Sequence, residues 1–284
     1  MPDRVSYTLR CQILYRHPTE GWKDPAMGAI VKRGDGELVF ELADKTQADD
    51  SSYALYTSVC VEAGQLVLPQ NYYAYDSFCY LNSLAVSNGA TVVTAMRSAD
   101  CTQSAIHCGS TSVGELWGSG TLTNRSAEAM RLIVSGKDRW SEFSGRLMKN
   151  IRWHATGWCR LTGTENSMTY ANAAVAGGKT AFMKAGNKAD ELSSLGKGTF
   201  YWGSAGTFLY LGAGETTDKD FVVADTSAGG PAVFDGGEQG GFRSTGSWSG
   251  DTLYPMLQRL VLQGEGAPCE IAGNIRTWTA NGIP

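Results

Sequence analysis

Residues 131–145 read RLIVSGKDRWSEFSG, and residues 259–273 read RLVLQGEGAPCEIAG. The two stretches share an arginine, an apolar run, a glycine, a glutamate and a final glycine in one register across fifteen positions. An Asn-Ile-Arg triplet follows each of them. This repeat predicts a chain built from two copies of one module, residues 1–150 and residues 151–284.

The repeated residues are expected to define the fold. The apolar run favours a strand, the first glycine a turn, and the residues after it a returning strand. Arg131 would then face Glu142 across one hairpin, and Arg259 would face Glu270 across the other. An exposed pair of this kind contributes only about 0.2 to 1 kcal/mol, so a structural role is favoured over a catalytic one. The structural set is Arg131, Gly136, Glu142, Gly145, Arg259, Gly264, Glu270 and Gly273.

Short apolar stretches with a period of two recur along the whole chain, and glycine, asparagine, aspartate and serine separate them. This pattern predicts strands rather than helices, and turn sequences such as Asn88-Gly89 favour antiparallel hairpins. We therefore expect an all-β chain of two tandem, related antiparallel modules, sandwich-like or barrel-like, with long loops rich in Gly, Ser and Thr. The expected strands are 7–15, 37–42, 53–61, 65–68, 78–86, 91–96, 130–134, 157–161, 199–202, 207–211, 220–224, 232–234, 258–263 and 270–278.

The composition describes a weakly charged protein. Of 284 residues 18% are charged and 35 are glycine, and the formal net charge is −4. A mildly acidic chain exerts no long-range attraction on nucleic acid or anionic membranes, so we expect neither sequence-specific nucleic-acid binding nor membrane insertion. The first residues lack a basic-then-apolar signal sequence, which favours cytoplasmic synthesis. The seven cysteines are then expected to be reduced thiols.

One stretch fits a relaxed phosphate-loop pattern. Residues 173–180 read AAVAGGKT, so Lys179 would neutralise a phosphate and Thr180 would hold magnesium. The segment before it is a poor buried parallel strand, and no βαβ series surrounds it. An ordinary loop is favoured, and a nucleotide hydrolase is kept as a minor alternative.

Few residues suggest metal or catalytic chemistry. His107 and Cys108 lie near Asp100 and Cys101. Zinc usually takes four ligands that come as two closely spaced pairs, and the sequence has no second closely spaced Cys/His pair to complete such a site. We expect no metal and no other cofactor. His154, beside a tryptophan, favours a structural role over general-base work. A carboxylate-based glycosidase stays open, because its acid and base are recognised by their separation in space.

Clustered aromatic side chains are the remaining candidates for binding. Tyr72, Tyr73 and Tyr75 lie in the first half, and Tyr201 and Trp202 lie in the second. Exposed rings of this kind stack on sugars or anchor a partner protein, whereas rings that alternate within a strand face the core half of the time. Core packing is favoured, and a carbohydrate- or receptor-binding module is the alternative.

A duplicated β module with glycine-rich loops, weak charge and no convincing active site predicts a non-enzymatic building block that forms a symmetric homo-oligomer. In this general character the whole chain resembles the virion structural proteins of tailed bacteriophages, the tail, connector and baseplate components. The resemblance implies synthesis in the host cytoplasm, a place in the virion, and contacts with copies of itself and with other virion proteins. It assigns no site residues. Function is expected where the two copies differ, at residues 97–114 and 227–250.

Overall fold

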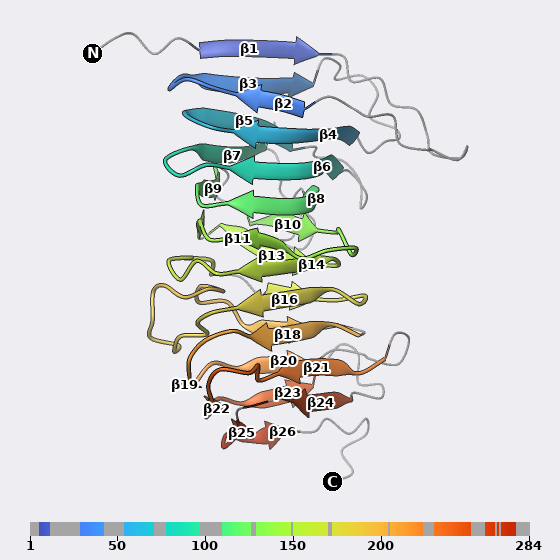
Figure 1. The fold of residues 1–284 in the computed structure, drawn as a ribbon, viewed down its shortest axis with the longest axis vertical. Helices are drawn as coiled ribbons and strands as arrows, with labels where there is room; N and C mark the ends of the chain where they lie inside the picture. The colour runs from blue at the N-terminus through green and yellow to red at the C-terminus, as the bar shows by residue number, and fades with distance from the viewer. Residues whose placement is uncertain are drawn as a thin grey trace.

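The structure, a computed structural model, is a coil of short β-strands stacked along one axis (Figure 1). The antiparallel sandwich or barrel expected from the sequence is wrong. Every strand ladder among the described residues is parallel, and only an isolated bridge between Asn166 and Ser193 is antiparallel. The structure describes residues 6–11, 29–42, 54–70, 78–96, 110–125, 129–148, 150–169, 172–203, 205–223, 230–250, 259–264, 266 and 268–276.

Two ladders of strands build the N-terminal half of the coil. The first ladder contains β1 (Ser6–Cys11), β3 (Glu37–Leu42), β5 (Gln65–Gln70), β7 (Thr91–Met96), β9 (Thr121–Asn124) and β12 (Arg146–Leu147). The second contains β2 (Ala29–Lys32), β4 (Ala54–Val61), β6 (Phe78–Val86) and β8 (Ser110–Gly118). Each strand pairs with the strand one coil further along the chain, so the two ladders face each other across the core.

The long strand β8 divides the second ladder into two. Its first residues pair with β10 (Met130–Val134), and its last residue, Gly118, pairs with Phe143 of β11 (Ser141–Phe143). The β10 ladder continues through β13 (Ile151–Ala155), β15 (Asn172–Ala174), β17 (Phe200–Trp202), β20 (Phe221–Val223), β23 (Trp248–Gly250) and β26 (Ile275–Arg276).

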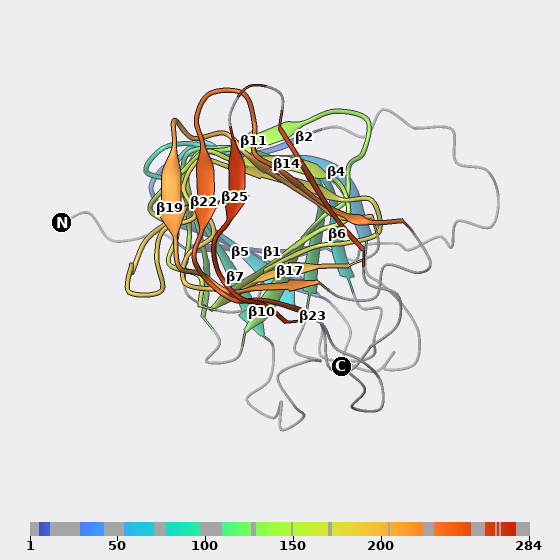
Figure 2. The ribbon, with the colours of Figure 1, turned by 90° about the horizontal axis from the view of Figure 1, so that it is seen from below.

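The β11 ladder continues through β14 (Trp158–Leu161), β16 (Lys179–Phe182), β18 (Thr207–Tyr210), β21 (Ala232–Asp235) and β24 (Leu260–Gln263). A third side forms near the C-terminal end from β19 (Glu215–Thr217), β22 (Phe242–Ser244) and β25 (Cys269–Ile271). Seen along its axis, the coil encloses its core on all sides (Figure 2).

The core consists of rows of side chains that repeat from coil to coil. In each strand alternate residues point inward, and parallel pairing places each of them over an inward residue of the previous coil. Phe200, Phe221 and Trp248 form one such row, with ring centroids 4.8 Å and 4.3 Å apart. All three are buried, and burial of each such side chain contributes about 1.5–3 kcal/mol.

Glycines at the corners let successive coils approach closely. A Cβ atom on Gly145 would meet the carbonyl oxygen of Gly120 in the coil before it, and a Cβ on Gly136 would meet that of Gly114. Both contacts are shorter than the 3.0 Å that real Cβ atoms respect. Two of the glycines in the repeated sequence are therefore required by backbone packing at corners.

The stack runs without interruption past the expected module boundary. β13, the first strand after residue 150, pairs along its full length with β10, the strand of the first repeat copy. The copies also lie on different sides, because β10 belongs to one ladder and β24, the strand of the second copy, belongs to another. A duplication at the origin of the chain stays a proposal about ancestry.

Candidate functional site

The charged residues of the repeat do not pair across hairpins, because no hairpin forms within the residues that the structure describes. Glu270 forms an ion pair at 3.0 Å with Arg243, its neighbour in the β22 and β25 ladder. Glu142 accepts a hydrogen bond from the Thr162 hydroxyl at 3.2 Å. Arg131 lies on β10 beside Arg152 of β13. The repeat glycines Gly136, Gly145 and Gly273 lie at corners that leave no room for a Cβ atom, and Gly264 is exposed.

Trp202, one of the aromatic candidates for binding, lies in the core. It is buried and packs against Trp248 at 5.6 Å, and its ring N–H donates to the Val233 carbonyl at 3.2 Å. Tyr201, next to it, points the other way and is half-buried. The expected tyrosines Tyr72, Tyr73 and Tyr75 lie outside the described residues.

Lys179 and Thr180, the residues of the phosphate-loop pattern, instead make contacts within the coil. Thr180 is fully buried and accepts a hydrogen bond from the Trp153 ring N–H at 2.9 Å, so its hydroxyl faces the core. The Lys179 ammonium lies 4.1 Å from the centroid of the Trp158 ring. The residues before them form a corner with positive φ at Ala176 and Gly177. This geometry offers no magnesium ligand at Thr180.

The four residues considered as possible metal ligands lie outside the described residues. They are Asp100, Cys101, His107 and Cys108. In the part of the chain that the structure describes, no group of three or more His, Cys, Asp or Glu gathers into a metal site. Nor does any helix there have the length and apolar character to cross a membrane.

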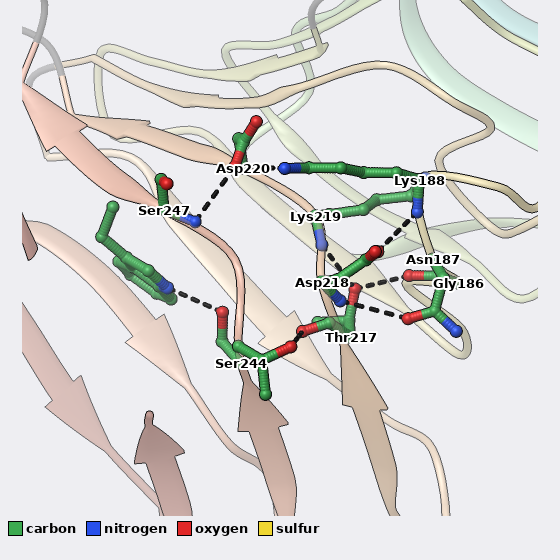
Figure 3. A network of polar contacts seen from close by, with 11 residues as sticks. Gly186, Asn187, Lys188, Thr217, Asp218, Lys219, Asp220, Ser244 and Ser247 are labelled. Carbon is green, nitrogen blue, oxygen red and sulfur yellow. Dashed lines mark hydrogen bonds and ion pairs between the residues drawn. The ribbon is translucent and has the colours of Figure 1, made fainter. Parts of the chain in front are cut away.

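The segment between β16 and β17, residues 183–199, is held against the end of β19 and the corner after it by a network of polar contacts (Figure 3). The Thr217 hydroxyl donates to the Gly186 carbonyl at 2.5 Å, and the Asp218 N–H donates to the Asn187 side chain at 3.1 Å. In return the Lys188 N–H donates to the Asp218 carboxylate at 2.6 Å. These reciprocal bonds hold a segment without regular structure against the coil.

Lys219 lies at the centre of this network and is only 2% exposed. Its ammonium donates to the Gly196 carbonyl. Burial lowers the pKa of Lys219 to about 8, against the opposing attraction of the carboxylates of Asp190, Glu215 and Asp218. An amine enclosed to this degree reaches no ligand, so we assign Lys219 a structural role.

Glu215 of β19 also binds the segment between β16 and β17. Its carboxylate accepts the backbone N–H groups of Ala185 at 2.8 Å and Gly186 at 2.6 Å. Burial raises the pKa of Glu215, while these two hydrogen bonds oppose the rise. The network therefore contains a half-buried acid, Glu215, and a buried base, Lys219, that satisfy backbone groups.

A row of tryptophans lies along the outside of the coil, and we call Trp117, Trp140 and Trp158 the tryptophan ladder. All three are half-buried and come from successive coils, in or next to β8, β11 and β14. The rings of Trp140 and Trp158 have centroids 6.0 Å apart at an angle of 44°. The ladder thus exposes parts of three large rings on one side.

Each ring of the tryptophan ladder has a cation against it. Arg139 lies 5.7 Å from the Trp117 centroid, Arg160 lies 5.5 Å from that of Trp140, and Lys179 completes the series on Trp158. Such contacts are worth about 0.5–1 kcal/mol each at exposed sites. The sequence does not reveal this surface, because the three tryptophans fall on one ladder only when the length of each coil is known.

The C-terminal end of the coil leaves its core open within the described residues. Leu262 occupies the inward row position of Phe234, which is 0% exposed, yet Leu262 is 42% exposed. Ile275 likewise pairs in register with the buried Trp248 of the previous coil, yet it is 65% exposed. We call the inward residues of this last coil, Leu260, Leu262, Ile271 and Ile275, the open end.

A scan against protein-family models, a search of curated proteins and a search of solved structures each found no match for this chain.

Proposed function

We propose that this protein is a non-enzymatic structural component that assembles with copies of itself into a symmetric oligomer through the open end. The observation that supports the proposal is the exposure of two inward core rows where they end, at Leu262 and at Ile275. A tail, connector or baseplate component of a phage virion is the setting proposed for such an assembly.

The backbone at the open end favours a protein partner. Strands β24, β25 and β26 each pair with a strand of the coil before them, and no described strand pairs with their other edge. An unpaired edge with apolar side chains is a template for another chain. Solenoid proteins also need a cap at each terminal coil, because an uncovered last repeat exposes the core.

A second copy of this chain supplies the complementary surface. Two open ends that meet about a twofold axis place each copy's apolar row on the other's, and the contact closes without further growth. The edge strands of the two copies would then run antiparallel. A contact from head to tail would instead generate a filament, so the twofold arrangement accounts for a closed symmetric assembly.

Light scattering after size exclusion, together with negative-stain imaging, tests this proposal. The wild type is expected to elute as an oligomer, and Ile275→Glu is expected to shift it to the monomer because a charge enters the contact. Val31→Glu is the matched control, because Val31 is also an exposed apolar residue, at 43%, but lies on β2 near the N-terminal end. A wild type that stays monomeric at high concentration contradicts the proposal.

A second candidate function is carbohydrate binding, favoured by the tryptophan ladder. Half-exposed rings stack on sugar rings, and the neighbouring arginines offer donors to hydroxyl groups. Glycan-array binding that is lost in Trp140→Ala but kept in Tyr201→Ala would support this function. An array without hits for the wild type removes it.

A further inference from the structure

Two arginines lie side by side on the outer surface of adjacent coils. Arg131 of β10 pairs in register with Arg152 of β13, and adjacent strands are about 4.8 Å apart. The neighbouring Leu132 and Trp153 are fully buried, so both arginines point outward. His154, two residues beyond Arg152, alternates with the buried Ala155 and is half-buried.

The two arginines carry positive charge without a counter-charge among the described residues. No side-chain hydrogen bond or ion pair within the described part of the chain involves the Arg131 or Arg152 guanidinium group. The Arg152 Nε–H is buried and has no acceptor among the residues that the structure describes. Like charges directly opposite each other on a ladder repel, and buried donors are normally satisfied. A bound anion would offset the repulsion between the two guanidinium groups and would give the Arg152 Nε–H an acceptor.

The surroundings change the pKa values of Arg131 and His154. Burial lowers the pKa of Arg131, and the charge of Arg152 lowers it further. Burial also lowers the pKa of His154 to about 4, with both arginine charges adding to the effect. At neutral pH His154 is therefore uncharged and keeps one ring N–H to donate.

We propose that Arg131, Arg152 and His154 form a binding site for a single phosphate-type oxyanion, either inorganic phosphate or the phosphoryl group of a monoester. Two guanidinium groups match the charge of about −1.5 to −2 that a phosphate carries at neutral pH, which a carboxylate does not. Guanidinium N–H groups bind phosphate oxygens in pairs, and the His154 N–H supplies a further donor. A long nucleic acid is a poor ligand, because the chain has a net charge of −4.

Titration calorimetry with inorganic phosphate and with phenyl phosphate, at constant ionic strength, tests the site. Saturable binding to the wild type is expected, with affinity reduced about tenfold or more in Arg131→Gln and in Arg152→Gln. Arg243→Gln is the matched control, because Arg243 is also an outward arginine of a parallel ladder but already pairs with Glu270. The tighter of the two ligands identifies the source of the phosphate group.

The imidazole of His154 gives a second readout that a purely structural role would not move. Phosphate is expected to raise the pKa of His154 by about one unit or more, because a nearby anion favours the charged form. The shift is followed by NMR of the ring nitrogens, with His154→Gln to assign the signal. Thermal unfolding without phosphate checks that the arginine variants are folded.

Three results would overturn the proposal. They are the absence of saturable phosphate binding to the wild type, equal weakening in Arg243→Gln, and acetate binding as tight as phosphate. None of them depends on the oligomeric state, so this site and the proposed assembly fail separately.

Discussion

Replacing Lys219 by methionine should change how the stability of the protein depends on pH. The ordinary pKa of 10.5 applies to this lysine in the unfolded chain, and burial lowers its pKa to about 8 in the folded protein. Between these values the unfolded chain binds a proton that the folded protein has released. The free energy of unfolding of the wild type therefore rises with pH across this window.

The expected size follows from the two pKa values. One pKa unit corresponds to about 1.36 kcal/mol, so lowering the pKa from 10.5 to about 8 predicts a gain of up to about 3 kcal/mol. Below pH 8 Lys219 is charged in both states, and its contribution no longer changes with pH. Burial also raises the pKa of Cys159 to about 12, which acts in the opposite direction but equally in wild type and variant.

Urea unfolding of wild type and Lys219→Met, from about pH 7 to about pH 10, measures the effect. The difference between their free energies of unfolding is the quantity of interest, because loss of the hydrogen bond to Gly196 contributes a constant offset. Lys188→Met is the matched control, since Lys188 is a lysine of the same network with a half-exposed side chain that pairs with Asp220. A difference between wild type and Lys219→Met that stays flat across this range would refute the reasoning.

Two further predictions concern the core and the corners. Trp153→Phe should lower the free energy of unfolding by about 1–3 kcal/mol, because the buried Thr180 hydroxyl loses its donor. Adding Thr180→Val should recover part of this loss, and a double variant at least as destabilised as the sum of the single variants would contradict the assignment. Gly145→Ala should destabilise by about 1–3 kcal/mol, because its methyl group meets the Gly120 backbone. The exposed Ser144→Ala should stay within about 0.5 kcal/mol in the same urea experiment, and equal effects at both positions would count against the packed corner.

The positions of some of the strands could be predicted from the sequence, whereas others, such as β8 and β16, were not expected. Residues 37–42, 78–86, 91–96 and 130–134 were each expected as one strand and form β3, β6, β7 and β10 with the same limits. The signal is local, because alternate apolar residues mark the inward positions of a strand whatever its partner is. The all-β character is confirmed for the same reason.

The direction of pairing could not be read in this way. Inward and outward residues alternate equally in parallel and antiparallel strands, so the alternation does not identify the partner. The coil length also varies, since Ser141 pairs with Cys159 but Ser83 pairs with Glu115. A constant repeat length would have revealed a solenoid, and here insertions of different size between strands hide it.

The surroundings of the candidate site residues could not be predicted either, because they depend on which strands pair. Trp202 was named for its type and position, but its inward register places it in the core. Lys179 was named for a motif, and it instead covers Trp158 of the previous coil. Arg131 was singled out as a repeated residue, and its significance depends on Arg152, which becomes its neighbour only through parallel pairing.

The orientation of the hydrogen bonds between coils has a mechanical consequence. Bonds such as that from the Thr156 N–H to the Val134 carbonyl connect one coil to the next and so run along the stacking axis (Figure 1). A pulling force applied at the two ends of the stack acts along these bonds at every interface, and the coils should separate one after another. The coil from Phe221 to Trp248 would release roughly 90 Å of chain. A force across the axis is instead shared among many coils, so the protein should resist lateral load far better than tension along its length.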